Sequence, residues 1–162
     1  MVVNIITRST RLHNLATVKE SIFKDVPKEI QINWHVVFDT NSLKDIDAEL
    51  LSSLKCNSTE YHFIKGDSVG MLYPQCSEII SKFNEGWVYF VDDDNIVHPE
   101  FYQYILNTIN KDPQKMVHVV SQNVSGKDFS SLNYRLATGS SMKIGSIDLA
   151  QYIVHIDVHN KY

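Results

Sequence analysis

Apolar residues in the first hundred positions follow two alternating periodicities. Short runs of β-branched and aromatic side chains, which are typical of strands, recur at residues 2–7, 31–38, 61–64 and 87–91. Between these runs, apolar side chains return every three or four positions, as on one face of a helix, and these stripes begin at Leu12, Ile46 and Leu72. The run at residues 87–91 is apolar throughout, which is typical of a strand buried on both faces.

The pattern becomes less regular after Asn95. Apolar residues at Phe101, Ile105 and Ile109 predict one more helix, and residues 116–120 predict one more strand. Beyond Ser121 the helical spacing disappears, and short strand or loop segments are expected at residues 132–137, 142–147 and 151–156. Strands that alternate with helices predict an α/β fold, a three-layer sandwich around a mostly parallel central sheet with a mixed tail. With no repeat or linker, residues 1–162 form a single domain.

Composition limits the class of protein and its partners. Hydrophobic residues make up 43% of the chain and charged residues 21%, which is typical of a folded protein and excludes disorder. The net charge of −4 without a Lys/Arg cluster predicts no nucleic-acid partner and no polybasic membrane surface. We expect no transmembrane segment and no signal peptide, and therefore a cytoplasmic protein. Cys56 and Cys76 lack a CxxC partner and are expected to be ordinary buried or semi-buried thiols.

Polar side chains gather at the points where the predicted strands end. In an open α/β sheet these carboxyl ends face a common crevice, and ligands bind there. Four clusters occupy such positions, namely Thr7-Arg8 with Arg11, Asp39-Thr40, Asp67-Ser68, and Asp92-Asp93-Asp94-Asn95. The sequence therefore predicts that they converge in space.

The three consecutive aspartates carry the strongest chemical signal. Carboxylates that crowd the end of a buried strand repel one another, so a bound cation is their natural partner. Oxygen ligands favour Mg²⁺ or Mn²⁺. On an extended backbone, Asp92 and Asp94 would face one way and Asp93 the other. The alternative is a solvated acidic turn in front of a helix, where the helix dipole favours aspartate.

At this point the chain resembles a known family. WVYFVDDDN followed by HPEFY is similar to the Asp-x-Asp region of glycosyltransferases with the GT-A fold, in particular family-2-type enzymes and β-1,3-glucuronyltransferases. IITRSTRLHNL, WHVVFDT and IDLAQYIV resemble other segments of these enzymes, so the resemblance extends over roughly residues 3–156. It implies a nucleotide-sugar-binding half in residues 1–98 and a partial acceptor-side half in residues 99–162.

The resemblance implies a metal-dependent glycosyltransferase of the hexosyltransferase type. Such an enzyme would transfer a sugar from a nucleoside-diphosphate sugar, UDP- or GDP-linked, to a glycan or other acceptor. The implied donor-site residues are Thr7, Arg8 and Arg11 by the nucleoside or diphosphate, Asp39 on the nucleobase, Asp67 by the same nucleoside, and Asp92 and Asp93 on the donor. Asp92 and Asp94 would hold Mn²⁺ or Mg²⁺. From the residues alone, Arg8 and Arg11 are equally explained as solvated loop cations, Asp39 as a helix cap and Asp67 as a turn residue.

The chain departs from the family pattern in two places. Residues 74–78 contain no arginine where family members carry an Arg-Asn pair, and the sequence stops soon after Asp148, where the family's usual base region would follow. Asp148 is then the candidate general base, with Asp157 behind it, although a structural aspartate is an equal interpretation. His98, His155 and His159 are weaker candidates for metal ligands.

The main alternative is a non-catalytic or partial GT-A-like domain that binds nucleotide or a partner. A nucleotidyltransferase is disfavoured because ITRSTRL lacks the glycines of its phosphate loop, and a receiver domain is disfavoured because the acidic cluster follows the fourth strand.

Overall fold

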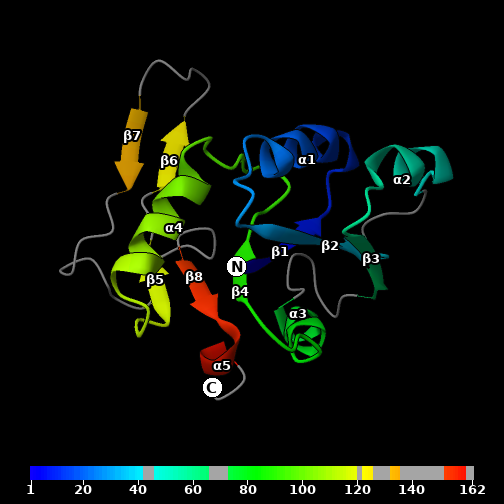
Figure 1. Ribbon diagram of the computed structural model, residues 1–162. Helices are drawn as coiled ribbons and strands as arrows, with labels where there is room; N and C mark the ends of the chain where they lie inside the picture. Colours follow the sequence, from blue (N-terminus) through cyan, green and yellow to red (C-terminus); the bar gives the residue numbers. More distant parts are fainter. Residues whose placement is uncertain (42–45, 66–72, 120–121, 126–131, 136–151, 160–162) are drawn as a thin grey trace.

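The computed structural model describes residues 1–41, 46–65, 73–119, 122–125, 132–135 and 152–159. Within this part, a six-stranded sheet has the strand order β3-β2-β1-β4-β8-β5 (Figure 1). Its strands are β1 (Val2–Ser9), β2 (Gln31–Asp39), β3 (Thr59–Ile64), β4 (Trp87–Phe90), β5 (Val117–Val119) and β8 (Tyr152–His155). The pairs β1–β2, β1–β4 and β2–β3 are parallel, and β8 is antiparallel to both β4 and β5. The predicted mostly parallel sheet is therefore confirmed.

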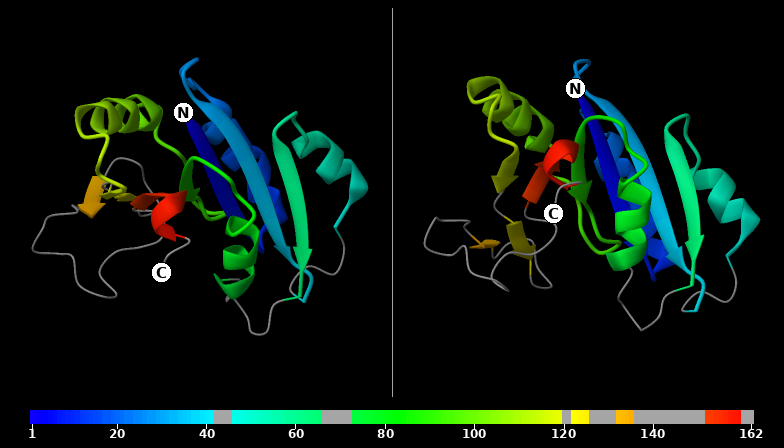
Figure 2. Two further views of the ribbon diagram at one scale, coloured as in Figure 1. Left: turned by 60° about the horizontal axis from the view of Figure 1, so that its bottom comes forward. Right: turned by 90° about the horizontal axis from the view of Figure 1, so that it is seen from below.

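Helices cover both faces of this sheet, as the alternating pattern predicts. Figures 1 and 2 show α1 and α2 on one face and α3 on the opposite face, which gives three layers. The helices are η1 (Leu12–Asn14), α1 (Leu15–Phe23), α2 (Ala48–Leu54), α3 (Tyr73–Ile80), α4 (Phe101–Lys111) and α5 (Ile156–His159). A separate two-stranded sheet consists of β6 (Gln122–Ser125) and β7 (Leu132–Arg135).

Each face of the sheet has its own hydrophobic core. On the face of α1, α2 and α4, Trp34, Phe38 and Tyr89 pack against buried residues of these helices. On the face of α3, Val88 and Phe90 pack against Cys76, Ile79 and Ile80 of that helix. All four residues of β4 are buried, which confirms the strand predicted to be covered on both sides. The strand end at Phe90 is thus fixed from both faces, and the aspartates follow directly.

The helix boundaries follow from local signals. Buried Leu15, Val18 and Ile22 form the inner stripe of α1, and the backbone becomes extended at Lys24, ahead of Pro27. Asp47 is the N-cap of α2 and accepts a hydrogen bond from the Glu49 backbone N–H at 2.9 Å. The cap of this helix is therefore Asp47, and the alternative interpretation of Asp39 as a helix cap is wrong.

The C-terminal segments differ most from the predicted elements. Residues 152–155 form β8, which lies between β4 and β5, so both predicted halves build one sheet. The chain turns into α5 at Ile156, where the sequence pattern indicated the end of a strand, and β6 was not predicted. Residues 142–147 lie outside the described residues. Such short segments acquire their structure from their sheet partners, because four residues carry little periodicity of their own.

Two predictions that rest on composition can also be compared with the structure. Cys76 is buried and Cys56 is half-buried, and both are free thiols, as expected. None of the helices in the described residues combines the length and apolar character that a membrane span requires.

Candidate functional site

The sheet topology has a switch point between β1 and β4. From β1 the strand order continues to β2 and β3 on one side and to β4 on the other, so the chain reverses its direction of winding at this point. In open α/β sheets, ligands bind at the carboxyl ends of the strands at such a switch point. Here these ends are Ser9 of β1 and Phe90 of β4. The loop with Arg11 and the turn with the three aspartates therefore meet there.

Arg8 and Asp92 form the first contact between these two segments. The Arg8 Nε donates to Asp92 Oδ1 at 2.8 Å, and Nη2 donates to Oδ1 and Oδ2 at 2.6 and 2.8 Å. Both side chains are 21% exposed. This bidentate geometry is the strong form of an arginine–carboxylate pair. It ties the end of β1 to the residues that follow β4.

Asp93 is the buried member of the aspartate cluster. Its Oδ2 accepts hydrogen bonds from the backbone N–H groups of Thr10 and Arg11, both at 2.6 Å, and its Oδ1 accepts one from Arg11 Nε at 3.0 Å. The side chain is 3% exposed. Asp93 thus holds the loop after β1 in place, a structural role that the sequence analysis missed. Its assignment as a donor contact stays a prediction.

Asp94 is the most accessible of the three carboxylates. Its side chain is 50% exposed, and its Oδ2 lies 2.9 Å from Nη2 of Arg11. The backbone turns here, with the Asn95 N–H donating to the Asp92 carbonyl at 3.0 Å. The alternating orientation expected for an extended backbone is therefore absent, and Asp93 and Asp94 share Arg11.

The charges in this cluster come from both segments. Desolvation acts to lower the pKa of Arg11, but the charges of Asp93 and Asp94 outweigh it and raise this pKa above its ordinary value. Arg8 and Arg11 are thus paired with aspartates rather than simply solvated. Two guanidinium groups face three carboxylates, so one negative charge remains in excess. That excess, together with the exposed oxygens of Asp94, fits a divalent cation with oxygen ligands.

Thr7 and Asp39 lie at the same end of the sheet but are buried. The Thr7 hydroxyl accepts a hydrogen bond from Trp34 Nε1 at 2.9 Å, so this side chain positions the core tryptophan. Asp39 ends β2, and its Oδ1 accepts a hydrogen bond from the Asn41 backbone N–H at 2.9 Å. Their assignment as nucleotide contacts stays a prediction.

The remaining candidates lie elsewhere. Asp67 and Asp148 are outside the described residues. His155 Nδ1 lies 3.4 Å from Asp157 Oδ2, and its ring packs edge-on against Trp87 at the start of β4. This pair is therefore at the opposite end of β4 from the aspartates. His98 is exposed, and its Nδ1 accepts a hydrogen bond from the Glu100 backbone N–H.

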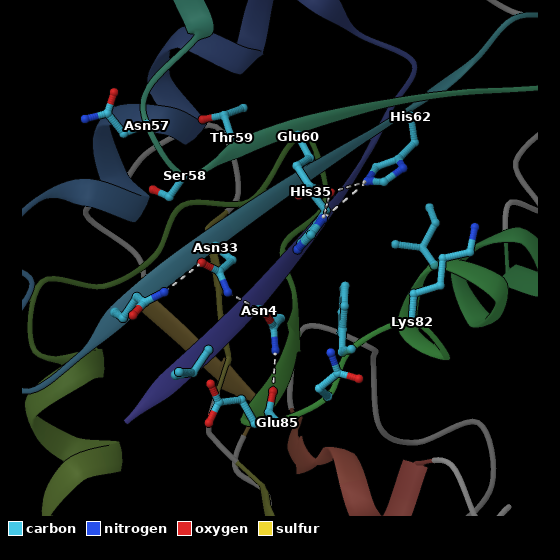
Figure 3. Close-up of a pocket in the computed structure, with 15 residues that line it drawn as sticks. Asn4, Asn33, His35, Asn57, Ser58, Thr59, Glu60, His62, Lys82 and Glu85 are labelled. Carbon is cyan, nitrogen blue, oxygen red and sulfur yellow. Dashed lines mark hydrogen bonds and ion pairs between the residues drawn. The ribbon is translucent and has the colours of Figure 1, made fainter.

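A second polar site lies on the α3 face, beside the first halves of β1, β2 and β3. A cavity of about 570 Å³ is lined there by His35, Glu60 and His62, whose side chains converge in Figure 3. His35 Nδ1 lies 3.2 Å from His62 Nε2 and 3.5 Å from a carboxylate oxygen of Glu60. That oxygen is 3.9 Å from His62 Nε2. This cluster was not predicted from the sequence. The Glu-x-His spacing in a strand is the only local signal for it, because it places two side chains on one face.

Burial favours the neutral form of both histidines in this cluster. Desolvation lowers the pKa of His35 to about 4, against the opposing effect of Glu60. Desolvation also lowers the pKa of His62. Next to them, Asn33 Nδ2 donates to Asn4 Oδ1 at 2.9 Å, and Asn4 Nδ2 donates to the Glu85 carbonyl at 3.0 Å (Figure 3). The cavity thus has a polar floor that is held by hydrogen bonds.

Solved structures of two other proteins have a similar fold. The chain is similar to residues 1–349 of TarS from S. aureus, with a TM-score of 0.68 at 13% identity over 99% of this chain and 49% of that one. The same protein has been solved with UDP, and a complex with UDP-GlcNAc gives a TM-score of 0.60 at 18% identity, covering 81% of this chain and 37% of that one. The chain is also similar to CMP:2-keto-3-deoxy-manno-octonic acid synthetase in complex with CTP, with a TM-score of 0.55 at 12% identity over 99% of this chain and 76% of that one.

These likenesses concern the fold. No family model matches the chain, and no curated protein matches it by sequence. The chain spans about half the length of the TarS structure that it matches. The fold is therefore of the GT-A, nucleotide-diphospho-sugar transferase type, as the resemblance in the sequence implied.

Proposed function

We propose that this chain binds a nucleoside-diphosphate sugar, UDP- or GDP-linked, between the carboxyl ends of β1 and β4, and that it transfers the sugar to an acceptor with the help of Mn²⁺ or Mg²⁺. One observation carries the proposal. Two arginines and three aspartates, more than 80 positions apart in the sequence, meet at the switch point of a sheet of this fold type. Cationic and anionic groups side by side suit a ligand that combines a diphosphate with a metal ion.

Some residues of the cluster have a structural role, and others are able to contact a ligand. Asp93 is buried and holds the loop after β1, so we assign it a structural role. Asp94 and Arg11 are about half exposed and can exchange their mutual contact for a ligand, the aspartate for a cation and the arginine for a phosphate oxygen. Arg8 and Asp92 can exchange partners in the same way. A divalent cation, when bound, neutralises the charge that develops on the leaving nucleoside diphosphate.

Calorimetric titration of the purified chain with UDP, GDP and CTP, each with and without Mn²⁺, tests the donor site. We expect UDP or GDP to bind with Mn²⁺, and Asp94→Asn to weaken that binding at least about tenfold, because it removes a charged ligand of the cation. Asp25→Asn is a matched control, because Asp25 is exposed and asparagine also tolerates its positive φ of 54°. If no nucleotide binds, or if both variants bind like the wild type, the donor site is not here. Preferential binding of CTP would instead favour nucleotidyl transfer.

Catalysis is tested separately from binding. An inverting transfer needs a base near the acceptor hydroxyl, and Asp148 is our candidate for it. We expect sugar transfer or slow donor hydrolysis with a panel of UDP- and GDP-sugars, and we expect Asp148→Asn to abolish this turnover without changing nucleotide affinity. Nucleotide binding without any turnover would favour the alternative, a non-catalytic GT-A-like domain.

A further inference from the structure

We propose that His35, Glu60 and His62 form a second metal site, which binds Zn²⁺ at the cavity on the α3 face. It is separate from the aspartate cluster, because it lies beside the first halves of β1, β2 and β3. The aspartates follow the carboxyl end of β4. The inference does not depend on the proposed sugar transfer.

The spacing of the three ligand atoms fits a zinc ion. His35 Nδ1, His62 Nε2 and the Glu60 carboxylate oxygen are separated by 3.2, 3.5 and 3.9 Å. The centre of the triangle that these three atoms form lies about 2.1 Å from each of them, which matches zinc–nitrogen and zinc–oxygen bond lengths. The ligand atoms therefore already surround a space of the correct size.

The parallel register of β2 and β3 places the three residues together. His35 is directly opposite Glu60 in the ladder, and His62 lies two positions further along β3, so all three share the α3 face. The ring of His35 packs on Phe83 with its centroid 4.6 Å away, and its side chain is only 6% exposed. Because two strands and a packed ring hold it, this ligand is preorganised for binding.

The cluster is open to an ion from solvent, because the side chains of Glu60 and His62 are 69% and 23% exposed. With Nδ1 as the ligand atom, the neutral ring of His35 carries its proton on Nε2, which is buried without a hydrogen-bond partner among the described residues. Packing against Phe83, rather than a hydrogen bond from Nε2, therefore orients this ring.

The donor set also distinguishes this site from the aspartate cluster. Two imidazole nitrogens and one carboxylate oxygen suit Zn²⁺, whereas Mg²⁺ and Mn²⁺ prefer oxygen alone. Three protein ligands leave a further coordination position, and the 570 Å³ cavity has room for a water there. This arrangement is typical of zinc sites that remain open to a ligand.

The full chain, freed of metal with a chelator, is titrated with Zn²⁺ by calorimetry and with Co²⁺ by visible absorption. We expect about one equivalent of Zn²⁺ to bind and the Co²⁺ complex to show the intense d–d bands of a tetrahedral or five-coordinate site. Glu60→Gln and His62→Gln should each weaken Zn²⁺ binding at least about tenfold, since each removes one of three ligands. Glu60 is exposed, so its variant is expected to keep the fold, and circular dichroism verifies this for both.

His13→Gln and Asp25→Asn are the matched controls. Both residues are exposed and belong to neither polar site, so neither change should alter Zn²⁺ affinity. The proposal is overturned if Zn²⁺ does not bind saturably, if Co²⁺ shows only weak octahedral bands, or if folded Glu60→Gln and His62→Gln bind like the wild type. Because no nucleotide is present, these outcomes are independent of the donor-site experiment.

Discussion

The two polar sites of this protein lie on the same sheet but differ in how their side chains are paired. At the carboxyl ends of β1 and β4, charged side chains of opposite sign pair with one another, and Asp93 is buried beneath them. Beside the first halves of β2 and β3, two neutral imidazoles and one exposed carboxylate face a cavity. A ligand at the first site must therefore exchange existing ion pairs, whereas a cation at the second site finds donor atoms that already converge.

Different interactions hold the side chains of the two sites in place. The first site is held by hydrogen bonds from backbone N–H groups to a carboxylate, so its shape depends on charge. The second is held by strand register and packing, so its shape depends on neutral side chains and on the sheet. Substitutions that remove a charge should disturb the first site. Substitutions that disturb strand packing, and a lower pH, should disturb the second.

The largest expected effect concerns the backbone next to the second site. Gly86 has a φ of 94°, and a Cβ there would lie 2.6 Å from the Val2 carbonyl oxygen. Gly86→Val should lower the free energy of unfolding by about 4 kcal/mol or prevent folding, because both strain and overlap oppose it. Urea denaturation measures this effect, and Glu85→Ala, an exposed neighbour, should cost less than about 0.5 kcal/mol. Equal stabilities of the two variants would contradict the prediction.

The buried aspartate of the first site should dominate its stability. Asp93→Asn keeps the side-chain shape but removes the charge that two backbone N–H groups and Arg11 contact, so we expect a loss of about 2–3 kcal/mol. Asp94→Asn, at a half-exposed position, should cost less than about 0.5 kcal/mol. Denaturant unfolding at pH 7 compares the two. If Asp94→Asn lowered the free energy of unfolding more than Asp93→Asn, Asp93 would not be the residue that holds the loop after β1.

Acidification should lower the stability of the fold through His35 of the second site. The pKa of His35 is about 4 in the folded chain against an ordinary 6.5, so between these values the unfolded chain binds more protons. The stabilisation is complete above about pH 6.5 and is lost as the pH falls toward 4, with a loss of about 2 kcal/mol between pH 7 and 5. Urea unfolding in EDTA measures it. His35→Gln should flatten this part of the profile, and an unchanged slope in that variant would exclude His35 as its source.

The smallest expected effect tests the geometry of the arginine at the first site. Arg8→Lys keeps the charge but loses the bidentate contact with Asp92, so unfolding should become easier by about 1 kcal/mol. If Arg8 also binds the diphosphate, affinity for the nucleotide in Mn²⁺ should fall about tenfold in the same variant. Lys82→Arg is the control, because Lys82 is exposed and lies on the α3 face of the sheet. Wild-type behaviour in both assays would mean that Arg8 acts only as a positive charge.

Much of the fold could be predicted because its signals are local. The buried run at residues 87–91 predicted β4 nearly to the residue, and the helical stripes predicted α1 and α4. The aspartate run marked the carboxyl end of β4. The turn at Asp92–Asn95 was not predictable, because it depends on contacts with a loop more than 80 positions earlier. The same holds for Thr7, whose hydroxyl is taken by Trp34 of the next strand.

The sequence by itself determined the order of strands and helices and the placement of acidic residues after a buried strand, because side-chain periodicity and strand ends are properties of neighbouring residues. Only the tertiary structure decided that β8 lies between β4 and β5, that Arg8 and Arg11 pair with the aspartates, and that His35 lies opposite Glu60. These contacts depend on the register and order of strands far apart in the chain. A local pattern cannot encode that register, because the alternation of side chains along a strand is the same whichever strand it pairs with.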